Sequence, residues 1–304
     1  MYVFFFRVKV KNIFIAGGTG FVGSNLKKFL ENKGYSVKLL SRSDGGSSII
    51  KYPKSADELS KIISGSFAVI NLAGASIAGK RWTEEYKNVL YNSRIDTTKF
   101  LVEAISKAEI KPEVFVSASA IGYYGDAGDK ELTEESPSAD GFVAKICVDW
   151  EIEAKKAEDY TKVFIPRIGV VLGKDGPLKQ ISLPFKLFVG GPFGPGTQFF
   201  SWVSLIDLLR IIEWGIDNKK SGVYNAVNPG ALKVKDFAKI LGRTLKRPSL
   251  FRVPSFVVKI VLGEAAQEVL RSQNIKPQRL KNEGFMFVDK DLSSALKRIY
   301  SKGL

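Results

Sequence analysis

The sequence predicts an α/β protein in which a doubly wound parallel sheet is followed by a smaller C-terminal lobe. Through the first half of the chain, short apolar stretches alternate with amphipathic helical ones, a pattern typical of parallel sheets with helices on both faces. After Gly173 the alternation stops, and a stretch rich in glycine, proline and phenylalanine begins. With 304 residues the chain is long enough for one large domain or two unequal ones.

Five apolar runs in the first half are short enough to be buried strands, and the stretches between them repeat apolar residues at helical spacing. The strands are expected at residues 12–16, 36–40, 67–74, 113–120 and 162–167. The helices are expected at residues 22–34, from Ser55 to Ile63, from Thr83 onward, at 96–108 and around Trp150. Ser55 and Glu58 have the spacing of a capping box, and Thr83 can cap the helix that follows it.

The second half of the chain is less regular. Residues 176–200 show little periodicity and are expected to form a long loop, which inside a compact domain is usually functional. Helical and strand patterns resume at residues 205–216, 222–227 and 234–245. We therefore expect residues 1–175 to form the first domain. Residues 176–304 should form mainly the C-terminal lobe, with some segments returning to the sheet.

The composition argues against several classes of function. The chain has no histidine and a single cysteine, Cys147, which argues against a metal centre and against a hydrolase built on serine and histidine. The net charge of +15 suggests an anionic partner. The basic residues are scattered and accompany no recognition motif, so no nucleic-acid partner is expected. No stretch is long and apolar enough to span a bilayer, which predicts a soluble, cytoplasmic protein without a membrane partner.

The turn after the first strand, "IAGGTGFVGSNL", predicts a dinucleotide site. Gly17, Gly20 and Gly23 have the spacing GxxGxxG between a strand and a helix, where glycine permits a tight turn and lets the backbone approach a pyrophosphate. The free N–H groups at the start of the helix would then face the phosphates. We expect a Rossmann-type domain that contacts its cofactor here through Gly17, Thr19, Gly20, Phe21, Val22 and Gly23.

The end of the second strand indicates which dinucleotide binds. An NAD enzyme usually has an acidic residue there that binds the ribose 2′-hydroxyl, whereas this chain has Ser41 and Arg42. A guanidinium can pair with the 2′-phosphate of NADP. Asp44 lies two positions further on and leaves NAD as the alternative. The predicted cofactor is NADP(H), as NADP or NADPH.

Several motifs resemble those of a known superfamily. "GGTGFVG", "VINLAG" and "FVSASAIGYYG" resemble the glycine turn, adenosine contact and active-site serine strand of extended short-chain dehydrogenases/reductases. "RWTEEYK", "SRIDTT", "RIGVVLG", "SWVSLIDL" and "KPQRLKNEGFMF" resemble an atypical subgroup, the epimerase family proteins with a C-terminal domain of unknown function. The resemblance covers nearly the whole chain from Asn12 onward. It implies further cofactor contacts at Leu72, Ala73, Gly74, Ser117 and Ala118.

The resemblance also indicates what this chain lacks. Members of the superfamily use Ser, Tyr and Lys, and the lysine charge lowers the pKa of the tyrosine that acts as acid or base. Aligned on these motifs, the tyrosine position holds Val143, the lysine position holds Cys147 and the position of an assisting asparagine holds Arg94. The serine is retained as Ser119. A thiol carries no positive charge, so we expect Cys147 to be a small buried hydrophobe.

Three side chains are candidates for catalysis: Ser119, Tyr124 and Arg94. Tyr124 follows Ser119 closely, and Arg94 could supply the missing cation and lower the pKa of a nearby tyrosine. Tyr123 is the alternative to Tyr124, because the sequence does not indicate which of the two faces the nicotinamide. The resemblance adds three candidates for contact with substrate, Arg81, Trp82 and Ser204.

Three functions remain open at this point. The first is an NADP(H)-dependent oxidoreductase that acts on an unknown small-molecule carbonyl or alcohol held by the C-terminal lobe. The second is a module that binds NADP(H) for sensing or regulation and has lost catalysis, since the usual tyrosine and lysine are missing. The third is a nucleotide-sugar epimerase or dehydratase. The resemblance further implies that a homodimer can form through the helices around Arg94 and Trp150.

Overall fold

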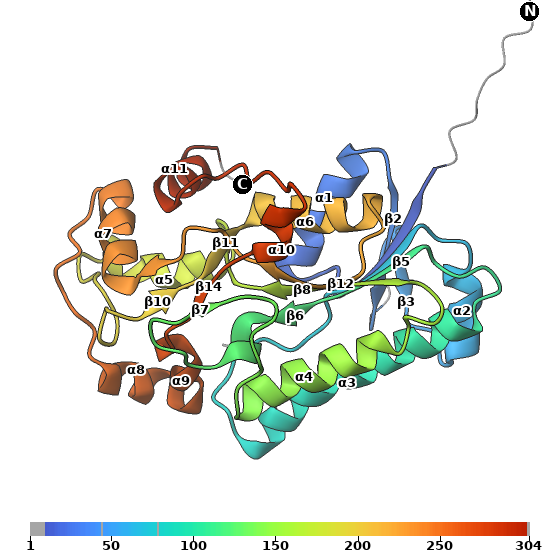
Figure 1. The fold of residues 1–304 in the computed structure, drawn as a ribbon, viewed down its shortest axis with the longest axis horizontal. Coiled ribbons are helices and arrows are strands. Elements are labelled where there is room, and N and C mark those ends of the chain that lie inside the picture. The colour runs from blue at the N-terminus through green and yellow to red at the C-terminus, as the bar shows by residue number, and fades with distance from the viewer. Residues whose placement is uncertain (1–9, 44, 78, 303–304) are drawn as a thin grey trace, which may run out of the picture.

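The computed structural model describes residues 10–43, 45–77 and 79–302. Its centre is a parallel sheet with the strand order β12-β8-β5-β4-β1-β2-β3, and the short β6 also pairs with β8 (Figure 1). The chain enters the sheet at β1 and builds outward on both sides, which confirms the predicted doubly wound α/β fold. The strands of this sheet are β1 (Asn12–Ala16), β2 (Ser36–Ser41), β3 (Ile49–Lys51), β4 (Ala68–Asn71), β5 (Val114–Ser117), β6 (Ser119–Ala120), β8 (Lys162–Ile168) and β12 (Gly222–Ala226).

Helices cover both faces of the sheet (Figure 1). One face is covered by α1 (Phe21–Asn32) and α6 (Leu205–Asp217). The other face is covered by α2 (Ala56–Ile63), α3 (Glu84–Lys107) and α4 (Phe142–Lys155). Each layer buries the apolar stripe of its helices against the strands, so two separate hydrophobic cores hold the sheet from either side.

Two predicted helix caps are present. The N–H of Glu58 donates to Ser55 Oγ at 3.2 Å at the start of α2. The N–H of Tyr86 donates to Thr83 Oγ1 at 3.1 Å at the start of α3. The sequence indicated two helical stretches after Thr83, but α3 runs through both without a break, as a single helix of 24 residues.

The smaller C-terminal lobe lies beside the sheet and has a core of its own (Figure 1). Its main helices are α5 (Pro177–Lys186), α7 (Val234–Leu245) and α11 (Leu292–Lys302). Phe185, Phe237 and Leu296 pack together inside it. The remaining elements are η1 (Ile121–Tyr124), β7 (Glu131–Leu132), β9 (Val170–Leu172), β10 (Phe199–Phe200), β11 (Trp202–Ser204), β13 (Leu232–Lys233), α8 (Ser255–Leu262), η2 (Gly263–Ala265), α9 (Ala266–Leu270), β14 (Asn274–Ile275) and α10 (Gln278–Asn282).

The prediction of a long loop at residues 176–200 is wrong for its first part, which is the helix α5. Pro177 occupies the first helical turn, where a proline costs no hydrogen bond. Leu178 and Phe185 are buried against the core of the C-terminal lobe. Pro184 lies within the last turn and obscures the helical pattern in the sequence. Packing against distant segments therefore decides the structure of this stretch.

Segments from after residue 200 return to the sheet. β12 extends its edge beside β8, and α6 covers one face. Two short parallel pairs also join distant parts of the chain, β9 with β11 and β7 with β14. Within the described ranges, no helix is long and apolar enough to cross a membrane.

Candidate functional site

The glycine turn lies at the carboxyl end of β1, where open parallel sheets bind their ligands. Gly17 has a φ of +75°, and a Cβ there would lie 2.6 Å from the carbonyl carbon of Leu72. A Cβ at Gly23 would lie 2.4 Å from the carbonyl oxygen of Gly17. These two glycines are therefore required by the packing of the protein itself.

Gly20 differs from the other two glycines of the motif. Among the described residues, a Cβ at Gly20 would approach nothing nearer than the carbonyl oxygen of Gly17, at 3.4 Å. Gly20 is also the N-cap of α1, and no described side chain caps that helix. The space beside Gly20 and the first N–H groups of α1 are thus available to an anion. In the same turn Thr19 is exposed, and Phe21 and Val22 are half-buried.

Ser41 and Arg42 lie at the carboxyl end of β2, the strand next to β1 in the sheet. Arg42 is exposed. Burial raises the pKa of the Tyr52 hydroxyl to about 12, and the nearby positive charge of Arg42 partly offsets that increase. Asp44, the residue that kept NAD as an alternative, lies outside the described residues.

The chain after β4 passes directly beneath the glycine turn. The N–H of Leu72 donates to the carbonyl of Ala16 at 2.9 Å, and the N–H of Ala73 donates to Asn71 Oδ1 at 3.1 Å. A Cβ at Gly74 would lie 3.0 Å from Cζ of Arg94. Leu72, Ala73 and Gly74 therefore form a floor at the same sheet edge as the glycine turn.

Arg94 projects from α3 against that floor. Its guanidinium donates to the carbonyl of Leu90 at 2.8 Å and to the carbonyl of Ala75 at 3.0 Å. Its Cζ lies 5.4 Å from the ring centroid of Trp150. Burial lowers the pKa of Arg94, and an ionised Cys147 would act in the opposite direction. A partly desolvated cation thus lies close to Cys147.

Ser119 and Tyr124 belong to one buried network of polar side chains. Ser119 Oγ donates to Glu151 Oε1 at 2.7 Å. Arg167 forms a bidentate pair with Glu151, from Nε to Oε1 at 2.7 Å and from Nη2 to Oε2 at 2.8 Å. Arg167 Nη1 also donates to the Tyr124 hydroxyl at 2.8 Å, which in turn donates to Asn225 Oδ1 at 2.6 Å. Every member of this chain of bonds is buried.

The cation beside Tyr124 is therefore Arg167, where the sequence had suggested Arg94. Burial raises the pKa of Tyr124 to about 12, although Arg167 and Asn225 act in the opposite direction. Burial disfavours the charge of Arg167, but its bonds and charge interaction with Glu151 outweigh this and raise its pKa. Tyr123 is half-buried, and its ring centroid lies 3.4 Å from Cζ of Arg167.

Val143 and Cys147 lie one turn apart on α4, facing η1. A Cβ at Gly122 would lie 2.4 Å from Val143 Cγ1 and 3.9 Å from Cys147 Sγ. Burial and the charge of Glu151 raise the pKa of the Cys147 thiol to about 12, against a smaller opposing effect of Arg94. This environment agrees with the expectation of a small buried hydrophobe.

Ser117 and Ala118, two further predicted cofactor contacts, lie at the carboxyl end of β5. Ser117 ends β5 and is buried, and its Oγ has no hydrogen-bond partner within the described part of the chain. Ala118 follows it and donates its N–H to the carbonyl of Asn71 at 2.9 Å. An unpaired buried hydroxyl at this edge of the sheet is a candidate partner for a bound group.

The three candidates for substrate contact are engaged elsewhere. Ser204 caps α6: it accepts from the N–H of Asp207 and donates to the Asp207 carboxylate at 3.0 Å. Arg81 donates to the carbonyl of Ile260. Trp82 Nε1 donates to the carbonyl of Ile77 at 2.9 Å. These contacts account for the three side chains as parts of the fold.

Glu151, Arg167 and Asn225 were not among the site residues predicted from the sequence. In the sequence, Glu151 serves to align the motif of α4, and Arg167 ends a predicted strand, where it could line the cleft or be paired. Asn225 lies 101 positions from its partner Tyr124, so no local spacing could reveal the contact. One chemical signal could have revealed the pair of Arg167 and Glu151: an arginine at the end of a buried strand requires an acidic partner nearby.

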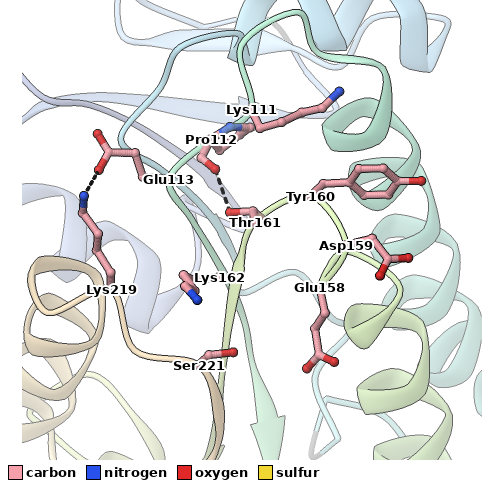
Figure 2. Close-up of a pocket in the computed structure, with 10 residues that line it drawn as sticks. All are labelled: Lys111, Pro112, Glu113, Glu158, Asp159, Tyr160, Thr161, Lys162, Lys219 and Ser221. Carbon is pink, nitrogen blue, oxygen red and sulfur yellow. Dashed lines mark hydrogen bonds and ion pairs between the residues drawn. The ribbon is translucent and has the colours of Figure 1, made fainter.

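A hollow of about 810 Å³ opens at the opposite edge of the sheet (Figure 2). Two of its charged lining residues pair, with Lys219 Nζ 2.7 Å from Glu113 Oε2. Thr161 Oγ1 donates to the carbonyl of Pro112 at 2.7 Å. The hollow lies at the amino ends of β5, β8 and β12, whereas ligands of open parallel sheets bind at carboxyl ends. We therefore assign the site to the edge with the glycine turn.

Much of the chain is similar to known protein families. The NAD dependent epimerase/dehydratase family matches residues 13–228, and a domain of unknown function, DUF1731, matches residues 253–299. The chloroplastic homolog of epimerase family protein SDR39U1 from Arabidopsis thaliana is 38% identical over 297 residues, which cover 94% of this chain and 85% of that protein. An epimerase family protein of Staphylococcus haemolyticus is 38% identical over 297 residues, 95% of this chain and 98% of its own.

A solved structure agrees over nearly the full length of both chains. The crystal structure of human epimerase family protein SDR39U1 with NADPH matches with a TM-score of 0.89 and 34% identity, over 96% of this chain and 99% of the human one. The fold, the glycine turn and the match of residues 253–299 to DUF1731 all indicate the same family. The chain belongs to the NAD dependent epimerase/dehydratase family of extended short-chain dehydrogenases/reductases, among the epimerase family proteins that carry the C-terminal domain DUF1731.

Proposed function

We propose that this protein binds NADPH at the carboxyl edge of its sheet and acts as an oxidoreductase on a small-molecule substrate held by the C-terminal lobe. The observation that carries the proposal is the difference between the three glycines. Gly17 and Gly23 are packed against protein atoms, whereas Gly20 borders free space at an uncapped helix N-terminus. That free space would accommodate a pyrophosphate. The human relative, similar over nearly its whole length, was crystallised with NADPH.

The adenosine end would lie over β2 and β4. Arg42, exposed at the end of β2, would pair with the 2′-phosphate, since a guanidinium binds phosphate with charge-assisted hydrogen bonds. Ser41 would contribute a hydroxyl to the same phosphate. Leu72, Ala73 and Gly74 would lie beneath the adenosine, and no acidic residue among the described ones ends β2.

The nicotinamide end would lie near Ser117, Ala118 and Ser119. NADPH supplies a hydride when it is bound. Ser119 commits its proton to Glu151, so its oxygen retains lone pairs that can accept a hydrogen bond from a substrate hydroxyl. Arg94 would supply positive charge on the α3 side, where the superfamily has asparagine and lysine nearby. Tyr124 would act through Arg167 as a positioning residue, because its hydroxyl is buried and has two partners.

A second candidate function is an NADPH-binding module without turnover. It is favoured by one observation: the hydroxyl groups of Ser119 and Tyr124 are both committed to internal partners, and both side chains are at most 3% exposed. Val143 and Cys147 offer no proton near neutral pH. In this case the cofactor site would be retained and the protein would respond to the NADPH concentration.

Calorimetric titration tests the cofactor proposal. The wild type should bind NADPH more tightly than NADH by about 1.5–3 kcal/mol, the range of a charge-assisted contact. Arg42→Ala should remove most of that preference, and Arg243→Ala, an exposed arginine on α7, should leave it unchanged. Equal affinity of the wild type for both nucleotides would refute the role of Arg42.

A separate measurement distinguishes the two functions. NADPH oxidation can be followed in the presence of a panel of aldehydes and ketones. Turnover that depends on Ser119, lost in Ser119→Ala while NADPH affinity is retained, would support the oxidoreductase. Tight NADPH binding without oxidation by any member of a broad panel would favour the sensor module.

A further inference from the structure

One end of the molecule exposes an unusual number of large apolar side chains. Leu183 on α5 and Leu187 at its C-cap are both exposed, and the chain after α7 presents Leu250, which is 83% exposed. Helix α8 follows directly and buries only Val258 among its eight residues. We call this the apolar end surface, and it comprises Leu183, Leu187, Phe188, Val189, Leu250, Phe251, Phe256, Ile260 and Val261.

Backbone hydrogen bonds join the two segments that carry this surface, the one after α5 and the one before α8. The N–H of Phe251 donates to the carbonyl of Gly190 at 3.3 Å, and the N–H of Gly194 donates to the carbonyl of Val253 at 2.9 Å. The segment after α5 therefore runs beside the segment that leads into α8, at the end of the molecule formed by the C-terminal lobe (Figure 1). Exposed apolar surface on this scale marks an interaction site.

Basic residues predominate around the surface, although Asp175 and Glu264 directly flank its two segments. Neither residues 176–206 nor residues 237–263 contain any aspartate or glutamate. The guanidinium of Arg247 lies 4.5 Å from the ring centroid of Phe188, so charge and apolar surface are interleaved. The exposed basic residues in these segments are Lys179, Lys186, Lys239, Arg243, Lys246, Arg247, Arg252 and Lys259.

We propose that the apolar end surface docks on a bilayer that contains anionic lipid. Its side chains lie on helices and on the connecting segments beside them, with Phe256, Ile260 and Val261 each more than 60% exposed. A bilayer interface accepts protruding apolar groups without a matching shape, and anionic headgroups attract the surrounding lysines and arginines. The long basic side chains can extend toward the headgroups while their stems stay among apolar groups. The sequence predicts no membrane partner because it contains no stretch able to span a bilayer. Docking at the bilayer surface needs no such stretch.

Sedimentation of the 304-residue chain with lipid vesicles tests the proposal. Vesicles of phosphatidylcholine with about one-third phosphatidylglycerol should bind the protein at least about tenfold more tightly than vesicles of phosphatidylcholine alone. Phe256→Ser/Ile260→Ser should abolish most of the binding. Lys186→Glu/Lys259→Glu, two exposed positions, should do the same without disturbing the core. The double variant Ile110→Ser/Met286→Ser removes two equally exposed apolar side chains outside the surface and should bind as the wild type does.

The affinity for NADPH serves as the control for folding, since none of these residues belongs to the proposed cofactor site. Absence of vesicle binding, or equal binding to neutral and anionic vesicles, would overturn the proposal. Self-association in analytical ultracentrifugation that is lost in Phe256→Ser/Ile260→Ser would also overturn it, because the occupant would then be a second copy of the chain.

Discussion

At the scale of single residues, Arg167 joins side chains that the sequence presents as unrelated. It pairs with Glu151 on α4, donates to Tyr124 on η1 and lies against the ring of Tyr123. Burial of the Arg167 and Glu151 charges costs desolvation free energy. Their close pairing offsets this cost only while both partners are present. The network is therefore strongly dependent on each of its members.

Removal of the arginine alone should be severe. Arg167→Met leaves the Glu151 carboxylate buried without its cation, so we expect a loss of about 3–5 kcal/mol in the free energy of unfolding, measured by urea denaturation. The double variant Glu151→Gln/Arg167→Met should lose less than the sum of the two single changes. Lys145→Met, which removes the exposed pair with Asp149, is the control and should change stability little. Strict additivity in the double variant would contradict a coupled network.

Cys147 gives a prediction that depends on pH. With a pKa raised to about 12, its thiolate fraction at neutral pH is roughly a thousandfold below that of an ordinary thiol. Iodoacetamide should therefore modify the native protein at least about 100-fold more slowly than the protein unfolded in urea. The native rate should still rise with pH up to pH about 10, because the thiol stays protonated below its pKa. A rate that reaches a plateau near neutral pH, and that NADPH suppresses, would instead identify a reactive thiolate.

At the scale of elements, the turn between β1 and α1 combines two different requirements for glycine. Gly20→Val should leave the fold intact but weaken NADPH binding by at least about 100-fold, because a branched side chain would occupy the space of the phosphates. Gly23→Ala should instead lower the stability of the fold by about 1–3 kcal/mol, since its Cβ would lie 2.4 Å from a backbone oxygen. Calorimetric titration and urea denaturation of both variants separate the two effects. Full NADPH affinity in a folded Gly20→Val protein would contradict the cofactor site.

The sequence predicts those elements whose pattern is local. The apolar run of β1 and the glycine turn lie within a dozen residues, and the caps at Ser55 and Thr83 depend on residues three positions away. Helix α5 was missed because its buried residues meet a core supplied by α7 and α11, far along the chain. In the site, the contact between Arg167 and Tyr124 spans 43 positions, and pairing across a sheet leaves no periodic signal in the sequence.

At the scale of the whole molecule, the two parts of the fold are joined at several places. β12 and α6 lie within the first sheet although they follow α5 in sequence. Lys87 Nζ at the start of α3 lies 2.7 Å from Glu264 Oε2 in η2, and Arg81 donates to the carbonyl of Ile260 in α8. Interleaved segments and shared contacts of this kind favour unfolding in a single cooperative step.

This cooperativity leads to a test with the cofactor. A ligand that binds only the folded state adds about 2.7 kcal/mol to the free energy of unfolding when its concentration is 100 times its Kd. For a chain of this length, that gain corresponds to a rise of about 4 °C in Tm. Differential scanning calorimetry should show one transition that NADPH shifts as a whole, since β12 and α6 cannot stay folded after the sheet has opened. NADH at the same concentration should shift it less, and Gly20→Val should not respond to either nucleotide. Two transitions, of which NADPH moves only one, would show that the sheet and the C-terminal lobe unfold independently despite their interleaved segments.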